Sequence, residues 1–129
     1  MAAIFEGYLS ALRSAGLPTP PEMVSEVHDF AHSAGEIGAS NLLDLDTPPT
    51  AIITLDDPIN TGAMQAIEQR GLRVPDDIAI VCYQERPGFA VRQPRLTTVK
   101  LPAYEMGQSA YKLLRRLIGK EEVEEKEVV

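Results

Sequence analysis

The chain has 129 residues, a formal net charge of −7 and a hydrophobic share of 44%, which together indicate about one globular domain of ordinary composition. The acidic balance argues against a nucleic-acid surface, which needs clustered lysines and arginines. Apolar runs are too short for a membrane span, and the first residues lack the basic-then-apolar order of a secretion signal, so a cytoplasmic location is expected.

Helical spacing marks the first element of the chain. Phe5, Tyr8 and Leu12 fall on one helical face, and Gly16 followed by Pro18 supplies a stop. A short strand is then expected over residues 24–28, followed by a second helix that ends near residues 43–45.

A strand–helix–strand unit forms the middle of the chain. The apolar run 51–55 predicts a strand buried on both faces. Asp57 then suits the N-cap and Pro58 the first turn of a helix that ends at Gly71. The run 78–83 predicts the next buried strand, so the sheet should be parallel with a right-handed crossover.

The last third begins with a long polar connection over residues 84–95. A brief strand is expected over 96–99, and a helix over 103–118. This helix has a single apolar stripe, made of Met106, Ala110, Leu113, Leu114 and Leu117. The tail 120–129 contains two lysines and five glutamates, and such a like-charge block indicates a solvated end.

Four stretches of the chain resemble the effector-binding core of the LacI–GalR family of bacterial transcription regulators, and they occur in the same order as in that family. The longest are PPTAIITLDDPINTGAMQAIEQRGLRVPDDIAIVCY (48–83) and PRLTTVKLPAYEMGQSAYKLLRRLI (94–118). The earlier ones are FEGYLSALRSAGL (5–17) and HDFAHSAGEIGASNLL (28–43). The resemblance covers nearly the whole chain, and the joint occurrence of these motifs makes it specific.

The resemblance implies an α/β fold with a three-layer parallel sheet, one incomplete lobe of a periplasmic-binding-protein-like type I architecture. In the family, two lobes close around a small effector, usually a sugar or nucleobase. Residues 1–119 resemble the second lobe with its crossover strand and following helix, and residues 120–129 form the acidic tail. Most of the first lobe, the strand before the first helix and a helix-turn-helix are absent, so DNA contact is expected only through a region outside this chain.

The resemblance also places the ligand contacts. Phe30 matches the aromatic that stacks on the ligand, Asp56 the acceptor after one strand, and Gln84 the acceptor after the next, where an aspartate is usual. Ile4 stands where the family has an arginine, and Cys82 replaces a glycine. These departures favour recognition of a different type from the family's usual one.

Each site residue also has a structural interpretation. Phe30 can equally cap the core, because aromatic side chains bury large areas wherever they lie. Helix capping is an alternative for Asp56 and the preferred interpretation of Asp57. Cys82 is expected to be a small buried hydrophobe.

The sequence contains no motif that indicates a catalytic, metal-binding or cofactor-binding site. A single cysteine and two histidines allow neither an internal disulfide nor a zinc cluster. His28 and His32 have no identifiable nucleophile and orienting partner. We therefore expect a non-enzymatic sensing domain without cofactor. A truncated lobe that only dimerises, or the sugar-binding component of a transporter, is the alternative.

Association with a second copy is the last expectation. The resemblance places residues 59–70 and 87–91 at the family's dimer surface, and it leaves the apolar stripe of helix 103–118 uncovered. Exposed stripes and unpaired strand edges are association sites. A homodimer is therefore expected, with the last helix as a candidate for exchange between copies.

Overall fold

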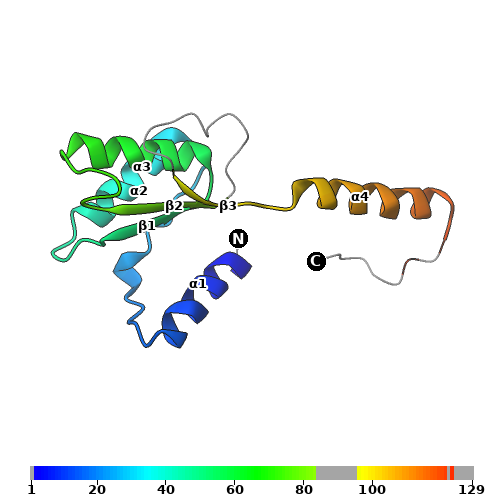
Figure 1. Cartoon of the computed structure of the whole chain (residues 1–129), viewed down its shortest axis with the longest axis horizontal. Helices are drawn as coiled ribbons and strands as arrows, with labels where there is room; N and C mark the ends of the chain where they lie inside the picture. Colours follow the sequence, from blue (N-terminus) through cyan, green and yellow to red (C-terminus); the bar gives the residue numbers. More distant parts are fainter. Residues whose placement is uncertain (1, 84–95, 122, 124–129) are drawn as a thin grey trace. The chain divides into compact units, whose positions relative to one another are not determined.

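The computed structural model describes residues 2–83, 96–121 and 123 (Figure 1). These residues form two compact units, Met1–Val99 and Lys100–Val129, which are described separately. The elements, in chain order, are α1 (Ala2–Ser14), the 3-10 turn η1 (Pro21–Met23), α2 (His32–Leu43), β1 (Ala51–Thr54), α3 (Asp57–Gln69), β2 (Ala79–Tyr83), β3 (Thr97–Val99) and α4 (Ala103–Ile118). The predicted boundary between residues 119 and 120 stays a prediction.

The strands form one parallel sheet in the order β1-β2-β3. Ala51 is in register with Ala79, and Val81 with Thr97. Helix α3 connects β1 to β2, so the strand–helix–strand unit predicted from residues 51–83 is confirmed. The α/β fold class with a parallel sheet is confirmed with it.

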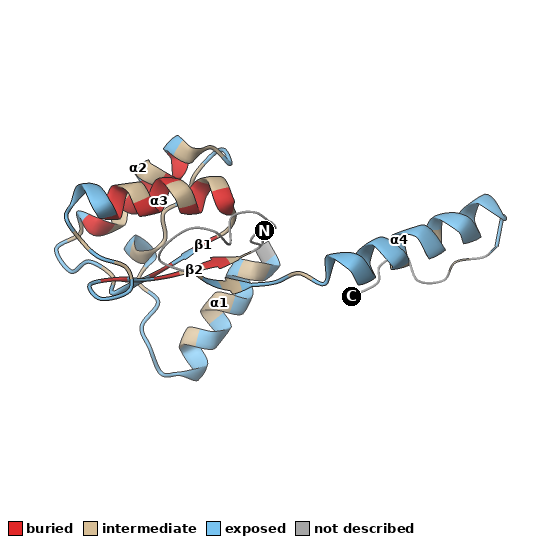
Figure 2. Ribbon diagram, turned by 45° about the horizontal axis from the view of Figure 1, so that its top comes forward, coloured by how far each residue is buried: buried red, intermediate tan, exposed pale blue. Residues whose placement is uncertain are grey.

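Helices α2 and α3 form the layer that buries the sheet's apolar side chains (Figure 2). The buried cluster consists of Ala39, Leu43, Ile52, Ala63, Met64, Ala66, Ile67, Ile78 and Ile80. Along β1 the side chains alternate, with Ile52 and Thr54 buried while Ala51 and Ile53 are exposed. The expectation that this strand is buried on both faces is therefore wrong, because within the described residues only one face of β1 is covered.

Two glycines allow α2 and α3 to approach each other at backbone distance. A Cβ added to Gly35 would overlap the carbonyl oxygen of Ile59, and one added to Gly62 would overlap the carbonyl oxygen of His32. No larger residue fits at either position without moving a helix. The close contact between the two helices therefore requires a residue without a side chain at both positions.

The strand predicted over residues 24–28 is wrong. Val24 has extended dihedral angles, with φ −119° and ψ 116°, but residues 24–27 belong to none of the strands in the described part of the chain. An extended segment becomes a strand only when a neighbouring backbone offers donors and acceptors in register. Here the segment packs against α2 instead: Val27 Cγ1 lies 3.2 Å from the position of a Cβ built on Gly38.

The predicted helices match the structure closely. Gly16 and Gly71 follow α1 and α3 with φ of 67° and 70°, the left-handed conformation that ends helices at low cost. Helix α4, in the second unit, has the predicted bounds, and large apolar residues such as Met106, Leu114 and Leu117 are exposed along it. No helix in the described ranges is long and apolar enough to cross a membrane.

Candidate functional site

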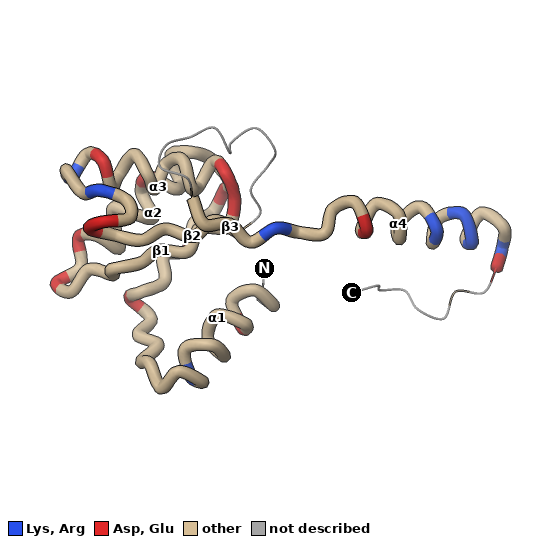
Figure 3. The backbone as a smooth tube through the Cα atoms, in the orientation of Figure 1, with Lys and Arg blue, Asp and Glu red and all other residues tan. Residues whose placement is uncertain are grey.

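The candidate site lies at the carboxyl ends of β1 and β2. Parallel strands place these ends at one edge of the sheet, where ligands of open α/β sheets bind. Thr54, the last residue of β1, is in register with Cys82 near the end of β2. Asp56 lies two residues after the end of β1, and the acidic pair it forms with Asp57 marks the start of α3 (Figure 3). Gln84 follows β2 in sequence but lies outside the described residues.

Asp56 is the N-cap of α3. Its Oδ1 accepts a hydrogen bond of 3.0 Å from the backbone N–H of Ile59, and its backbone is extended, with φ −156° and ψ 175°. The prediction that Asp57 is the cap is therefore wrong by one residue, since Asp57 is already helical and only 4% exposed. Asp56 is half-buried, and a carboxylate has more acceptor capacity than one cap uses.

A buried polar contact, which sequence reasoning missed, holds this turn in place. Thr54 Oγ1 donates to Asn60 Oδ1 at 3.0 Å, and both residues are 4% exposed. Thr54 Oγ1 also lies 3.4 Å from the carbonyl oxygen of Val81. The end of β1, the first turn of α3 and β2 are thus connected through one hydroxyl. The signal in the sequence is a hydroxyl residue near the end of an apolar run, six positions before an amide.

Phe30 precedes α2 on a bend and is 56% exposed. Its interpretation as a core residue is wrong, because a core aromatic would be buried. The neighbouring Asp29 accepts a 3.0 Å hydrogen bond from the backbone N–H of Ala31 through Oδ1, which orders the turn. Phe30 precedes α2 and Asp56 caps α3, so the two sequence-predicted contacts lie on different elements.

Cys82 is a buried thiol, 1% exposed, on the middle strand of the sheet. This confirms its interpretation as a small buried hydrophobe. His28 and His32 lie on either side of Phe30 in sequence. Across residues 2–83, 96–121 and 123, histidine, cysteine, aspartate and glutamate side chains form no group that could hold a metal ion.

One ion pair with shifted pKa values lies in the turn before β2, away from the carboxyl ends. Hydrogen bonds from the Arg73 guanidinium and backbone N–H lower the pKa of Asp77. The Asp77 carboxylate, in turn, raises the pKa of Arg73. The Nε–Oδ2 distance is 3.0 Å. This pair stabilises the turn at the amino end of β2.

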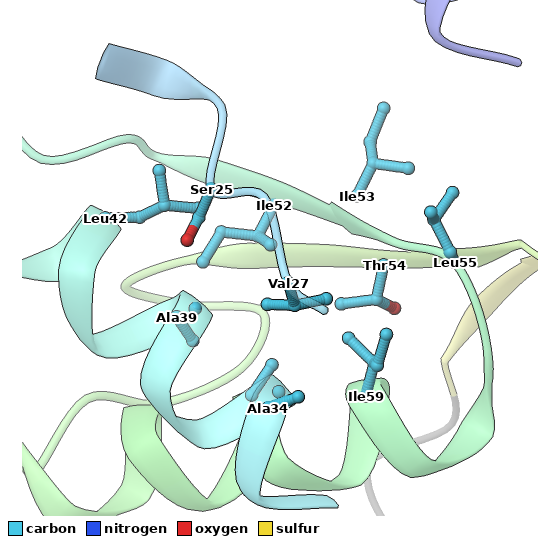
Figure 4. Close-up of a pocket in the computed structure, with 13 residues that line it drawn as sticks. Ser25, Val27, Ala34, Ala39, Leu42, Ile52, Ile53, Thr54, Leu55 and Ile59 are labelled. Atoms are coloured by element: carbon cyan, nitrogen blue, oxygen red, sulfur yellow. The ribbon is translucent and has the colours of Figure 1, made fainter. Parts of the chain in front are cut away.

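An apolar groove of about 90 Å³ runs between β1, α2 and the segment 24–27 (Figure 4). Ser25, Val27, Ala39 and Ile52 are among its lining residues, whereas Phe30 and Asp56 are not. Pockets that enclose a small ligand measure roughly 300–1,000 Å³ and place polar groups around it. The groove is therefore too small and too apolar to be the binding site of a sugar.

Comparison with known proteins covers most or all of the chain. Residues 1–129 match the model of a periplasmic binding protein-like domain. The HTH-type transcriptional repressor CytR of Escherichia coli K12 is 36% identical over 109 residues, which are 84% of this chain and 32% of that protein. Catabolite control protein A of Priestia megaterium is 33% identical over 119 residues, or 92% of this chain and 36% of that protein.

Solved structures give the same result. The transcription regulator CcpA of Lactococcus lactis superimposes with a TM-score of 0.84 at 30% identity, over 95% of this chain and 44% of that one. A LacI family transcriptional regulator of Enterococcus faecium with bound ribose gives 0.77 at 29% identity, with the same coverage. The chain thus spans about a third of the length of its curated relatives.

Proposed function

This chain belongs to the periplasmic binding protein-like domain family, in the form found in LacI-type regulators, and from that premise we propose that it forms one wall of a regulator's effector-binding site. The ligand is a small sugar-like molecule. Its binding favours a closed arrangement of two lobes, and the difference in affinity between the two arrangements carries the signal. The role is non-enzymatic, as in the relatives, which are transcription regulators.

The observation that carries the proposal is the position of Asp56. It lies two residues after β1, at the carboxyl edge of a parallel sheet, and the Thr54–Asn60 hydrogen bond fixes the turn around it. A carboxylate held in this way accepts hydrogen bonds from ligand hydroxyls without reorganisation, which is the advantage of a preorganised site.

Phe30 and Gln84 complete the proposed contacts. An exposed aromatic ring offers a flat apolar surface to a sugar face, and the Gln84 amide offers both a donor and an acceptor. The ribose-bound structure of the Enterococcus faecium regulator supports a sugar-like ligand. Ile4 in place of an arginine favours an uncharged ligand, since an aliphatic side chain cannot pair with a carboxylate.

The second candidate function is a lobe that associates without sensing. The observation that favours it is the exposed apolar side of α4, which includes Leu114 and Leu117. In either case we propose a homodimer in the cytoplasm, with DNA bound only through a region outside this chain. If α4 holds the dimer together, sedimentation of the variant with Leu113 and Leu117 both changed to Glu will show a monomer; an undisturbed dimer excludes that role for the helix.

The test uses a two-lobed chimera, because one wall cannot bury a ligand. By calorimetry, the 129-residue chain alone should show no affinity for common sugars or purines. In the chimera, this chain replaces the matching segment of the Enterococcus faecium regulator, and ribose, other sugars and nucleosides are titrated. Phe30→Ala should abolish the binding found, whereas Phe5→Ala, which removes a similarly exposed ring from α1, should not. Equal effects of the two substitutions would refute a pocket role for Phe30.

A further inference from the structure

A ring of hydrogen bonds encloses Asp56 at the start of α3. Its carbonyl oxygen accepts a 2.8 Å hydrogen bond from the N–H of Asn60, and its Oδ1 accepts one of 3.0 Å from the N–H of Ile59. Two residues before Asp56, Thr54 Oγ1 donates to Asn60 Oδ1 at 3.0 Å. Asn60 thus holds Asp56 through its backbone and the end of β1 through its side chain, so the segment 54–60 closes on itself.

The helix cap uses one oxygen of the Asp56 carboxylate. Oδ1 bonds to the first turn of α3, and Asp56 is half-buried. A carboxylate can accept about four hydrogen bonds through its two oxygens, so Oδ2 keeps its capacity for a ligand hydroxyl. Because both oxygens belong to one planar group, the hydrogen bond at Oδ1 also fixes the direction of Oδ2.

Thr54 and Asn60 are polar residues in an otherwise apolar contact between β1 and α3. Both are 4% exposed, whereas Ile52, Ala63 and Ile67 of the same two elements belong to the hydrophobic cluster. An apolar pair would fill this space without a donor or an acceptor to satisfy. Apolar packing is non-directional, whereas a hydrogen bond requires a heavy-atom distance of about 3 Å and a nearly linear geometry. The pair therefore fixes the turn more narrowly than packing alone.

The single proton of the Thr54 hydroxyl is donated to Asn60. Oγ1 also lies 3.4 Å from the carbonyl oxygen of Val81 on β2, but a hydroxyl donates only one hydrogen bond, and the contact with Asn60 is shorter. Loss of the hydroxyl would leave Asn60 Oδ1 buried without this donor. The consequence would therefore be felt at the first turn of α3, where Asp56 is held.

We infer that Thr54 and Asn60 are positioning residues of the effector site, which act on a ligand through Asp56. This inference rests on the proposed function, because the pair has this role only where Asp56 accepts a hydrogen bond from the ligand. The pair holds the carboxylate in its binding orientation before the ligand arrives, so that little ordering remains to oppose binding. Neither side chain needs to touch the ligand, since both are buried.

The test uses a variant that removes the hydrogen bond and keeps the packing. Thr54→Val combined with Asn60→Leu puts apolar groups of similar shape in place of both partners, an exchange that can be nearly neutral for folding. In the whole 129-residue chain, amide hydrogen exchange measured by NMR should become at least tenfold faster at the Ile59 N–H, which bonds to Asp56. Exchange at Ile67, later in the same helix, should stay unchanged, because it reports wider unfolding of α3.

Two results would overturn the inference: an unchanged exchange rate at Ile59, or equal changes at Ile59 and Ile67, which indicate a merely structural role. Thr54→Ser is the matched control, because it keeps the hydroxyl, and it should exchange as the unmodified chain does. If the double variant does not fold, Thr54→Val alone, with Asn60 in place, gives the same comparison with Thr54→Ser.

Ligand affinity separates this inference from the proposed function. Ribose is titrated by calorimetry into the two-lobed chimera with each variant. The double variant should bind roughly threefold to tenfold more weakly, the range that one neutral hydrogen bond contributes, and Thr54→Ser should bind normally. If Asp56→Ser weakens binding and the double variant does not, the positioning role is overturned and the proposed function stands. If Asp56→Ser has no effect, the proposed function fails. In that case, or if the chimera binds no ribose, the exchange rates at Ile59 and Ile67 alone decide whether the pair positions Asp56.

Discussion

Replacing Gly62 by alanine tests the close contact of α2 and α3. A Cβ at this position would overlap the carbonyl oxygen of His32 and lie 2.6 Å from the backbone nitrogen of Glu36. Both atoms belong to the backbone of α2, which cannot rotate away as a side chain can. The helices must separate, and the buried residues between them and the sheet lose contact.

The expected magnitude follows from two opposing effects. Overpacking of a close-packed interior costs about 1–3 kcal/mol, and the upper end applies where backbone atoms collide. The higher helix propensity of alanine, compared with a mid-helix glycine, offsets about 1 kcal/mol of this cost. The free energy of unfolding should therefore fall by about 2 kcal/mol, which corresponds to a decrease of roughly 10 °C in Tm for a domain of this size.

Thermal and urea unfolding followed by circular dichroism measure this change. Gly7→Ala is the matched control: Gly7 also lies within a helix, α1, and a Cβ added there meets nothing within 4 Å. The control should be neutral or slightly more stable. A Gly62→Ala protein as stable as the unmodified chain would refute the contact of α2 with α3 described here.

The remaining predictions concern the turns and the thiol. Asp56→Ala should lower the free energy of unfolding by about 1 kcal/mol in urea titrations, whereas Asp56→Ser, which keeps a cap acceptor, should cost only a fraction of that. Because the folded-state pKa of Asp77 is lowered, its stabilisation is present above the ordinary aspartate pKa of about 3.9 and is lost as the pH falls through the folded value. NMR titration of Arg73→Gln should show the pKa of Asp77 moving up toward that ordinary value, and an unchanged pKa would contradict the pairing. Cys82 should react with a thiol reagent only at the rate of unfolding, and rapid labelling of the folded chain would show that the strand is not buried.

Elements defined by local signals could be predicted from the sequence. Apolar periodicity, prolines and helix-ending glycines such as Gly16 and Gly71 act over a few residues, so α1, α3 and α4 lie where expected. The strands β1 and β2 were predictable for the same reason, since each is an apolar run between turn residues. Cys82 followed from its place inside such a run.

Features that depend on distant segments could not be predicted in this way. Residues 24–27 have the composition of a strand, but pairing requires a neighbouring backbone that the segment itself does not specify. The same holds for the uncovered face of β1, for the Thr54–Asn60 hydrogen bond and for the approach of Gly62 to α2, because each joins groups whose contact is set by the packed structure. The predicted cap, Asp57, differs by one residue from the observed cap, Asp56. Both aspartates suit the position, and only the backbone dihedral angles distinguish them.

The most direct test of the proposed effector site is the affinity of the two-lobed chimera with and without the Asp56 carboxylate. Asp56→Ser keeps the helix cap and removes the charge, so the Tm of the chimera should change little. Calorimetry with the sugar or nucleoside that the chimera binds should then show an affinity lower by roughly tenfold to a hundredfold, as expected for a lost hydrogen bond to a charged group. An affinity unchanged by Asp56→Ser, in a chimera that remains folded, would contradict the assignment of this edge of the sheet as the effector site.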